Sequence, residues 1–186
     1  MYLVGVCCGG PRAATHLAVV HRGRRGVAKR YEVVRTASHR PPAAAADLAA
    51  AVAGLFYDRA LTTRKPRFSQ VGRPRKWILA RPTVLVGGLP GPELAKELHR
   101  RRVVFMTVSA RPGTAWRVET RPGRPGADLS VAPEDLAGVL ERVRGEGRLV
   151  TTAAGVDLRA VTLAVWYEEN LRQIGRRRQA AGVRPA

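Results

Sequence analysis

The chain has 186 residues, 45% of them hydrophobic, which suits one domain with a buried core and excludes a wholly disordered protein. Thirty-three lysines and arginines against 14 aspartates and glutamates give a formal net charge of +19, which favours polyanionic partners. No apolar run reaches the length of a membrane span and no signal-peptide pattern opens the chain, so we expect a soluble cytoplasmic protein without a membrane partner.

The first predicted elements are three strands, Leu3–Cys7, Thr15–Val20 and about Tyr31–Arg35, the last two joined by a basic hairpin tip near Gly26. Cys7 and Cys8, the only cysteines, are neighbours on a strand and should face opposite sides, so they should not pair with each other. A core role for the cysteines is favoured over a nucleophilic one. The four histidines show no ligand spacing, and we predict neither a metal nor another cofactor.

The middle of the chain predicts a helix over Ala43–Leu61 and a basic loop over 62–77. A buried strand follows at Thr83–Val86, then a helix that begins near Pro92 and a strand over 103–110.

The last third predicts a loop over 111–126 and a helix from Pro133 to about Gly145. A final helix over Leu158–Ile174 precedes a basic, flexible tail, 175–186. Three antiparallel strands followed by alternating helices and strands indicate one α/β domain, 1–174, with a mixed sheet flanked by helices.

This order is also that of the RNase H-like fold. The stretches "VGVCCGGPRAATHLAVVHRG", "TVLVGGLPGPELAKELHRRRVVFMTVSA" and "LSVAPEDLAGVLERVRGEGRLV" resemble the nuclease domain of phage terminase large subunits, from about Tyr2 to Ile174. The resemblance implies an RNase H-like sheet, a link to nucleic acid, and an origin in a phage or mobile element.

The resemblance also implies acidic residues that hold two divalent cations, and the expected positions lack them. Cys7 ends the first strand, and Gly87 and Gly88 follow the second catalytic strand. The C-terminal segment in which the family carries its last acid reads "IGRRRQAAG". A thiolate does not replace a carboxylate for Mg²⁺ or Mn²⁺. We therefore expect a catalytically silent domain with no catalytic residue.

Basic runs supply the candidate nucleic-acid contacts. They comprise Arg22, Arg24, Arg25, Lys29 and Arg30 in the hairpin, Arg64, Lys65, Arg67, Arg73, Arg75 and Lys76 in the basic loop, and Arg176, Arg177 and Arg178 in the tail. Runs with almost no interleaved acid favour contacts to a phosphate backbone, without sequence specificity. DNA is favoured over RNA as the partner, with or without a surrounding protein complex.

Two alternatives stay open. One is an active metal-dependent nuclease with a rearranged site, which would need acids such as Asp47, Asp58, Asp128 and Asp157 to meet at the carboxyl end of the sheet. The other is a structural or assembly protein whose basic faces bind an acidic partner. The acids of the last two helices, among them Glu168 and Glu169, are interpreted as helix-start and surface charges.

Overall fold

A computed structural model describes residues 1–9, 12–25, 28–41, 43–68, 74–88, 92–110, 117–119, 128–151 and 157–180. Residues 25, 65–68, 74–77, 92, 117–119, 128 and 171–180 are described by their backbone alone. The strands are β1 (Tyr2–Cys7), β2 (Thr15–Arg25), β3 (Ala28–His39), β4 (Thr63–Phe68), β5 (Pro74–Ala80), β6 (Thr83–Gly87), β7 (Phe105–Ala110), β8 (Arg117–Glu119), β9 (Asp128–Val131) and β10 (Leu149–Thr151). The helices are α1 (Ala45–Tyr57), α2 (Pro92–Arg100), α3 (Pro133–Gly145) and α4 (Leu158–Ala180), with a short 3-10 helix at Arg59–Leu61.

The main sheet has eight strands in the order β10-β3-β2-β1-β6-β7-β9-β8. β1, β2 and β3 are antiparallel neighbours, whereas β6 pairs in parallel with β1, β7 with β6 and β9 with β7. The predicted mixed sheet is therefore confirmed. We call the end of the sheet at which β1 and β6 begin the hairpin end, and the end at which they finish the carboxyl end.

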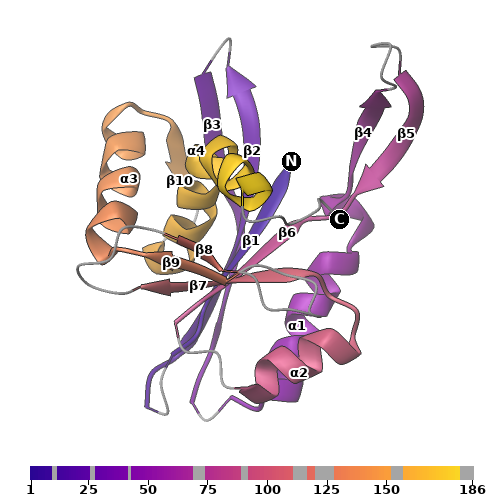
Figure 1. The fold of residues 1–186 in the computed structure, drawn as a ribbon. Coiled ribbons are helices and arrows are strands. Elements are labelled where there is room, and N and C mark those ends of the chain that lie inside the picture. The colour runs from indigo at the N-terminus through magenta and orange to yellow at the C-terminus, as the bar shows by residue number, and fades with distance from the viewer. Residues whose placement is uncertain are drawn as a thin grey trace.

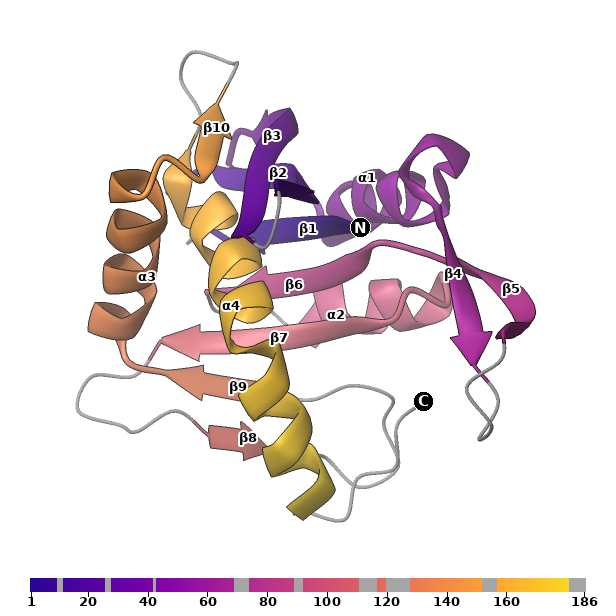
Figure 2. The same ribbon diagram turned by 90° about the horizontal axis from the view of Figure 1, so that it is seen from above.

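Helices cover both faces of this sheet (Figures 1 and 2). Val4, Val6 and Val84 pack with α1 and α2 on one face, whereas Leu3 and Leu85 pack with α3 and α4 on the other. Strands buried on both faces read as continuous apolar runs, which is why β1 and β6 were evident from the sequence.

α4 crosses β1 at very short range because β1 carries a glycine there. A Cβ atom added to Gly5 would lie 1.9 Å from the backbone oxygen of Ala160. Only glycine allows this approach of a helix backbone to the middle of the strand.

The described residues 63–68 and 74–77 form strands where a loop was predicted, and residues 69–73 lie outside the described residues. β4 and β5 form an antiparallel hairpin, a separate two-stranded sheet. Pro66 and Pro74 argued against strands, but a two-stranded ribbon has free outer edges, and proline is tolerated at edges and as a first strand residue. The prolines were therefore compatible with a hairpin.

Two helix boundaries also differ from those predicted. α1 ends at Tyr57, with the 3-10 helix after it, and α4 runs through Ala180. Residues 175–180 of the expected tail are therefore helical, while 181–186 lie outside the described residues. Most of the expected loop 111–126 also lies outside them, apart from β8. No helix in the described part of the chain is long and apolar enough to span a membrane.

Candidate nucleic-acid interface

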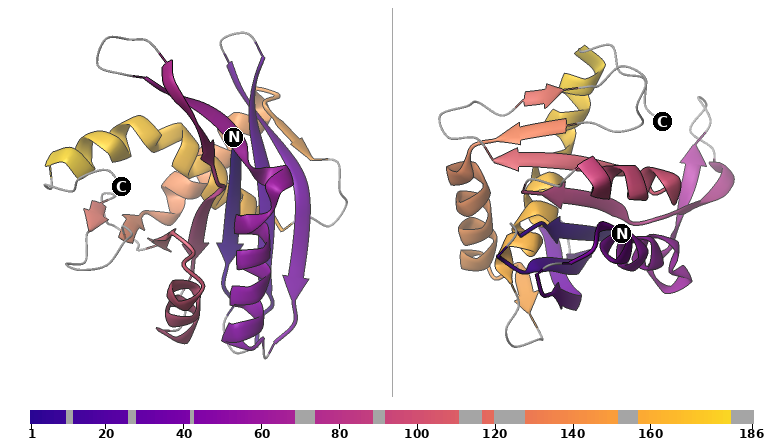
Figure 3. Two further views of the ribbon diagram at one scale, coloured as in Figure 1. Left: turned by 90° about the vertical axis from the view of Figure 1, so that its right-hand side faces the viewer. Right: turned by 90° about the horizontal axis from the view of Figure 1, so that it is seen from below.

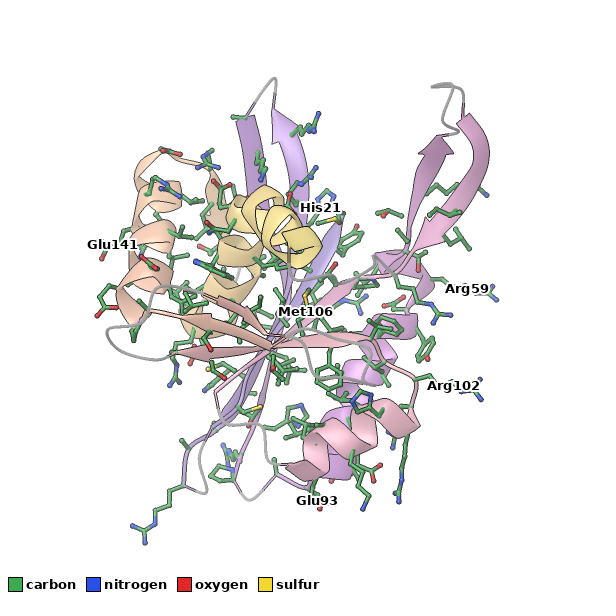
Figure 4. All side chains as sticks on the ribbon, viewed as in Figure 1. His21, Arg59, Glu93, Arg102, Met106 and Glu141 are labelled. Atoms are coloured by element: carbon green, nitrogen blue, oxygen red, sulfur yellow. The ribbon has the colours of Figure 1, made fainter. Side chains whose placement is uncertain are left out.

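The β2–β3 hairpin extends well beyond the sheet that supports it. β1 pairs with β2 only as far as Tyr2 opposite His21, yet β2 and β3 stay paired to Arg25 opposite Ala28. Figure 4 places His21 where the hairpin leaves the body of the molecule. Arg24 and Arg30 are exposed on this projection. The backbone of Arg25 lies in β2 as well.

A buried glutamate fastens the base of this hairpin to α4. The side chain of Glu168 is 1% exposed. Arg22 donates to its Oε1 from Nε at 2.9 Å, and Arg22 Nη2 lies 2.8 Å from the same oxygen in an ion pair. Lys29 Nζ lies 3.5 Å from the same oxygen and donates to the carbonyl oxygen of Glu168 at 2.6 Å. The interpretation of Glu168 as a surface charge is therefore wrong. Arg22 and Lys29 hold the hairpin in place.

A second ion-pair network reinforces the same junction. The Tyr31 hydroxyl donates to Glu169 Oε1 at 2.5 Å, and Arg148 Nη1 donates to that oxygen at 3.0 Å. Burial alone would raise the pKa of Glu169, but the hydrogen bonds from Arg148 and Tyr31 lower it overall. Burial and the bond to Glu169 raise the pKa of Tyr31.

Because the pKa of Glu169 is lower in the folded chain than its ordinary value of 4.5, the protein should lose stability in acid. The charged form is favoured by folding, so this contribution is complete above pH 4.5 and is lost as the pH falls through the lower folded pKa. Urea titrations from pH 6 to pH 3 should show a smaller loss of unfolding free energy for Glu169→Gln than for the wild type. Equal losses would contradict the assignment.

The β4–β5 hairpin is the second basic projection. Arg64 is exposed in β4, and the backbones of Lys65, Arg67, Arg75 and Lys76 lie in the two strands, whereas Arg73 lies outside the described residues. Leu79 at 71% exposure and Ile78 at 40% show that the adjoining part of β5 is not covered by the body of the protein. No acid occurs between Asp58 and Glu93.

The third predicted group lies on α4. Arg176, Arg177 and Arg178 belong to its last turns, and their backbones alone are described. Their part in binding remains a prediction.

The carboxyl end of the sheet is where the resemblance implied a metal centre. Cys7 pairs with Gly87 of β6 and with His16 of β2. Asp157, just before α4, lies 3.3 Å from His16 Nε2, measured from its Oδ2. The negative charge of Asp157 also acts to raise the pKa of Cys7. The rearranged-site alternative named Asp157, but the sequence does not show that it lies beside His16.

These residues do not fit a pair of divalent cations. A Cβ atom at Gly87 would lie 2.5 Å from Leu163 Cδ1, so the space for a side chain at this position is already filled. Arg159 donates to Asp157 at 2.7 Å, and this bond holds the pKa of Asp157 below its ordinary value while offsetting its charge. Among the described residues, no group of three or more histidines, cysteines or acids could hold a metal ion.

Among the described residues, the structure does not gather the other acids of the rearranged-site alternative into a group with Asp157. Asp47 is exposed in the first turn of α1, and Asp58 pairs with Arg35 at 3.0 Å. The side chain of Asp128 lies outside the described residues.

The cysteines face opposite sides of the sheet, as predicted. Cys7 packs against the core on the α4 side and Cys8 against the core on the α1 side. Burial raises the pKa of Cys8 to about 11 and also raises the pKa of Cys7, an effect that Arg159 partly offsets. Both thiols are therefore largely protonated at neutral pH and poor nucleophiles.

The strand order, with three antiparallel strands leading into parallel β6, β7 and β9 and helices on both faces, defines the RNase H-like class of α/β folds. No family model and no curated protein sequence matches the chain.

Among solved structures, the large terminase nuclease from thermophilic phage G20c is similar to it, with a TM-score of 0.50 and 12% sequence identity. The alignment covers 91% of this chain and 82% of that one. At this identity, the likeness shows the fold alone.

Proposed function

We propose that this chain is an RNase H-like domain that binds the phosphate backbone of nucleic acid without sequence specificity and without cleaving it. DNA is favoured over RNA, and the terminase-like fold is consistent with a place in a phage or mobile-element complex. The observation that carries the proposal is the pair of projecting hairpins. Each hairpin bears a run of basic residues, and no acid interrupts either run. The chain as a whole has a formal net charge of +19.

The absence of cleavage is supported by the carboxyl end of the sheet. Two cations need several oxygen ligands whose negative charge offsets their repulsion. Cys7 and Gly87 stand at two of the expected positions, and the charge of Asp157 is offset by Arg159.

Binding of labelled duplexes of two unrelated sequences, followed by fluorescence anisotropy, tests this proposal. Each unlabelled duplex should compete for the other with equal affinity, because phosphate contacts carry no base information. A preference greater than about tenfold for one sequence would point to base contacts and contradict the proposal. Failure of both duplexes to bind would favour an acidic protein partner instead.

A further inference from the structure

Both basic hairpins leave the molecule at the same end. β2 and β3 extend past the start of β1, and β5 leads into β6, whose first residue, Thr83, pairs with Leu3 near the start of β1. The views in Figures 1 and 3 agree that the strand pairs β2–β3 and β4–β5 extend from the molecule in the same direction. We call residues 22–25 and 28–30 the β2–β3 prong, and residues 63–68 and 74–80 the β4–β5 prong.

The carboxyl end lies far from these prongs. Arg25 is nine positions along β2 from His16, the partner of Cys7, which at about 3.3 Å per residue is a separation of about 30 Å. Glu93, at the start of α2, lies at the opposite end of the molecule from the prongs (Figure 4). A ligand seated between the prongs would not reach Cys7 and Gly87.

The charges at the helix termini differ between the two ends of the sheet. α1, α2 and α3 follow strands that finish at the carboxyl end, and their first turns carry the acids Asp47, Glu93, Glu134 and Asp135. α2 and α3 then run back and carry bases in their last turns, namely His99, Arg100, Arg142 and Arg144. Acids near helix starts and bases near helix ends are ordinary. Their alignment here favours phosphate at the ends of α2 and α3 over their starts, although Arg12 and Arg40 are also exposed at the carboxyl end.

The shape of the β4–β5 prong favours a duplex over a single strand. The major groove of double-stranded DNA admits a two-stranded β-ribbon, and a single strand offers no such groove. β4 and β5 form a ribbon of this kind, separate from the main sheet, with Lys65 opposite Ile78 and Arg67 opposite Lys76.

On these observations, which build on the proposed function, we propose that a nucleic-acid duplex lies across the hairpin end. The β4–β5 prong enters a groove, and the β2–β3 prong contacts the adjacent backbone. On the β2–β3 prong, the exposed side chains of Arg24 and Arg30 contact phosphate. Glu168 holds this prong in position through its ion pairs with Arg22 and Lys29. The surface is thus distinct from the carboxyl end of the sheet.

A pair of double variants tests the location. Arg24→Ala/Arg30→Ala should weaken duplex binding about tenfold and reduce the slope of log K against log salt by up to about 2. The matched control is Arg12→Ala/Arg40→Ala, which removes two exposed arginines at the carboxyl end. The control should change affinity less than about threefold, because charges beyond a Debye length are screened. Circular dichroism should show that both variants fold.

Photocrosslinking gives an independent readout that does not depend on affinity. Ala28 at the β2–β3 prong and Ala13 in the turn before β2 are both exposed, so each tolerates a photoreactive amino acid. We expect crosslinks to the duplex from position 28 and none from position 13, and tighter binding of duplex than of a single strand of equal length. Three results would overturn this inference while leaving backbone binding intact. They are crosslinks from position 13 alone, a loss of affinity in the Arg12/Arg40 variant equal to that in the Arg24/Arg30 variant, and tighter binding of the single strand. Failure of the wild type to bind any nucleic acid would instead defeat the proposed function itself.

Discussion

Gly5→Ala is expected to lower the free energy of unfolding by about 3 kcal/mol, the upper part of the usual range for overpacking a core. The added Cβ atom would lie 1.9 Å from the backbone oxygen of Ala160, and a backbone atom cannot turn away as a side chain can. β1 and α4 would have to move apart, which would disrupt the core that packs between the sheet and α4. Urea unfolding followed by circular dichroism measures the change.

The control for this variant is Gly54→Ala. Gly54 lies in α1 with nothing within 4 Å of a Cβ atom, so alanine should stabilise the protein by about 0.5–1 kcal/mol through helix propensity. If Gly5→Ala were as stable as the wild type, α4 would not cross β1 as closely as described.

The second large effect concerns binding. Changing Arg64, Lys65, Arg73 and Arg75 together to alanine should weaken binding to every duplex by a similar factor, at least about tenfold at moderate salt. If all four contact phosphate, the slope of log K against log salt should become shallower by about 3.5, since each contact contributes about 0.9. Titrations from 50 to 200 mM salt would measure both quantities.

A charge-conserving variant separates lost phosphate contacts from a damaged hairpin. Lysine at positions 64, 73 and 75 keeps the net charge, so the salt slope should stay close to that of the wild type. Unaltered affinity and slope in the alanine variant would show that the β4–β5 prong does not bind nucleic acid.

The sequence was most informative where local pattern and burial coincide. β1 and β6 are apolar runs buried on both faces, and α3 begins at Pro133 with acids in its first turn, so each could be predicted from a few residues. The opposite orientation of Cys7 and Cys8 follows from strand geometry alone.

Features that depend on distant parts of the chain were missed. Glu168 lies midway along α4 and is followed by Glu169 and Asn170. Its sequence neighbours give no sign that it pairs with Arg22 and Lys29, far away in the chain. The β4–β5 hairpin was not predicted because Pro66 argues against a strand, unless that strand is known to lie at the edge of a sheet. Asp157 was named as a possible member of a rearranged site, but the sequence does not show that it lies near Cys7 and His16.

The central claim, that this RNase H-like domain binds a phosphate backbone and does not cut it, is tested most directly by one titration. A labelled DNA duplex would be bound across a salt series, with parallel samples incubated with Mn²⁺ and resolved for cleavage. We predict tight binding that weakens steeply with salt and a duplex that stays intact. Cleavage that requires Mn²⁺, or affinity that does not change with salt, would contradict the account.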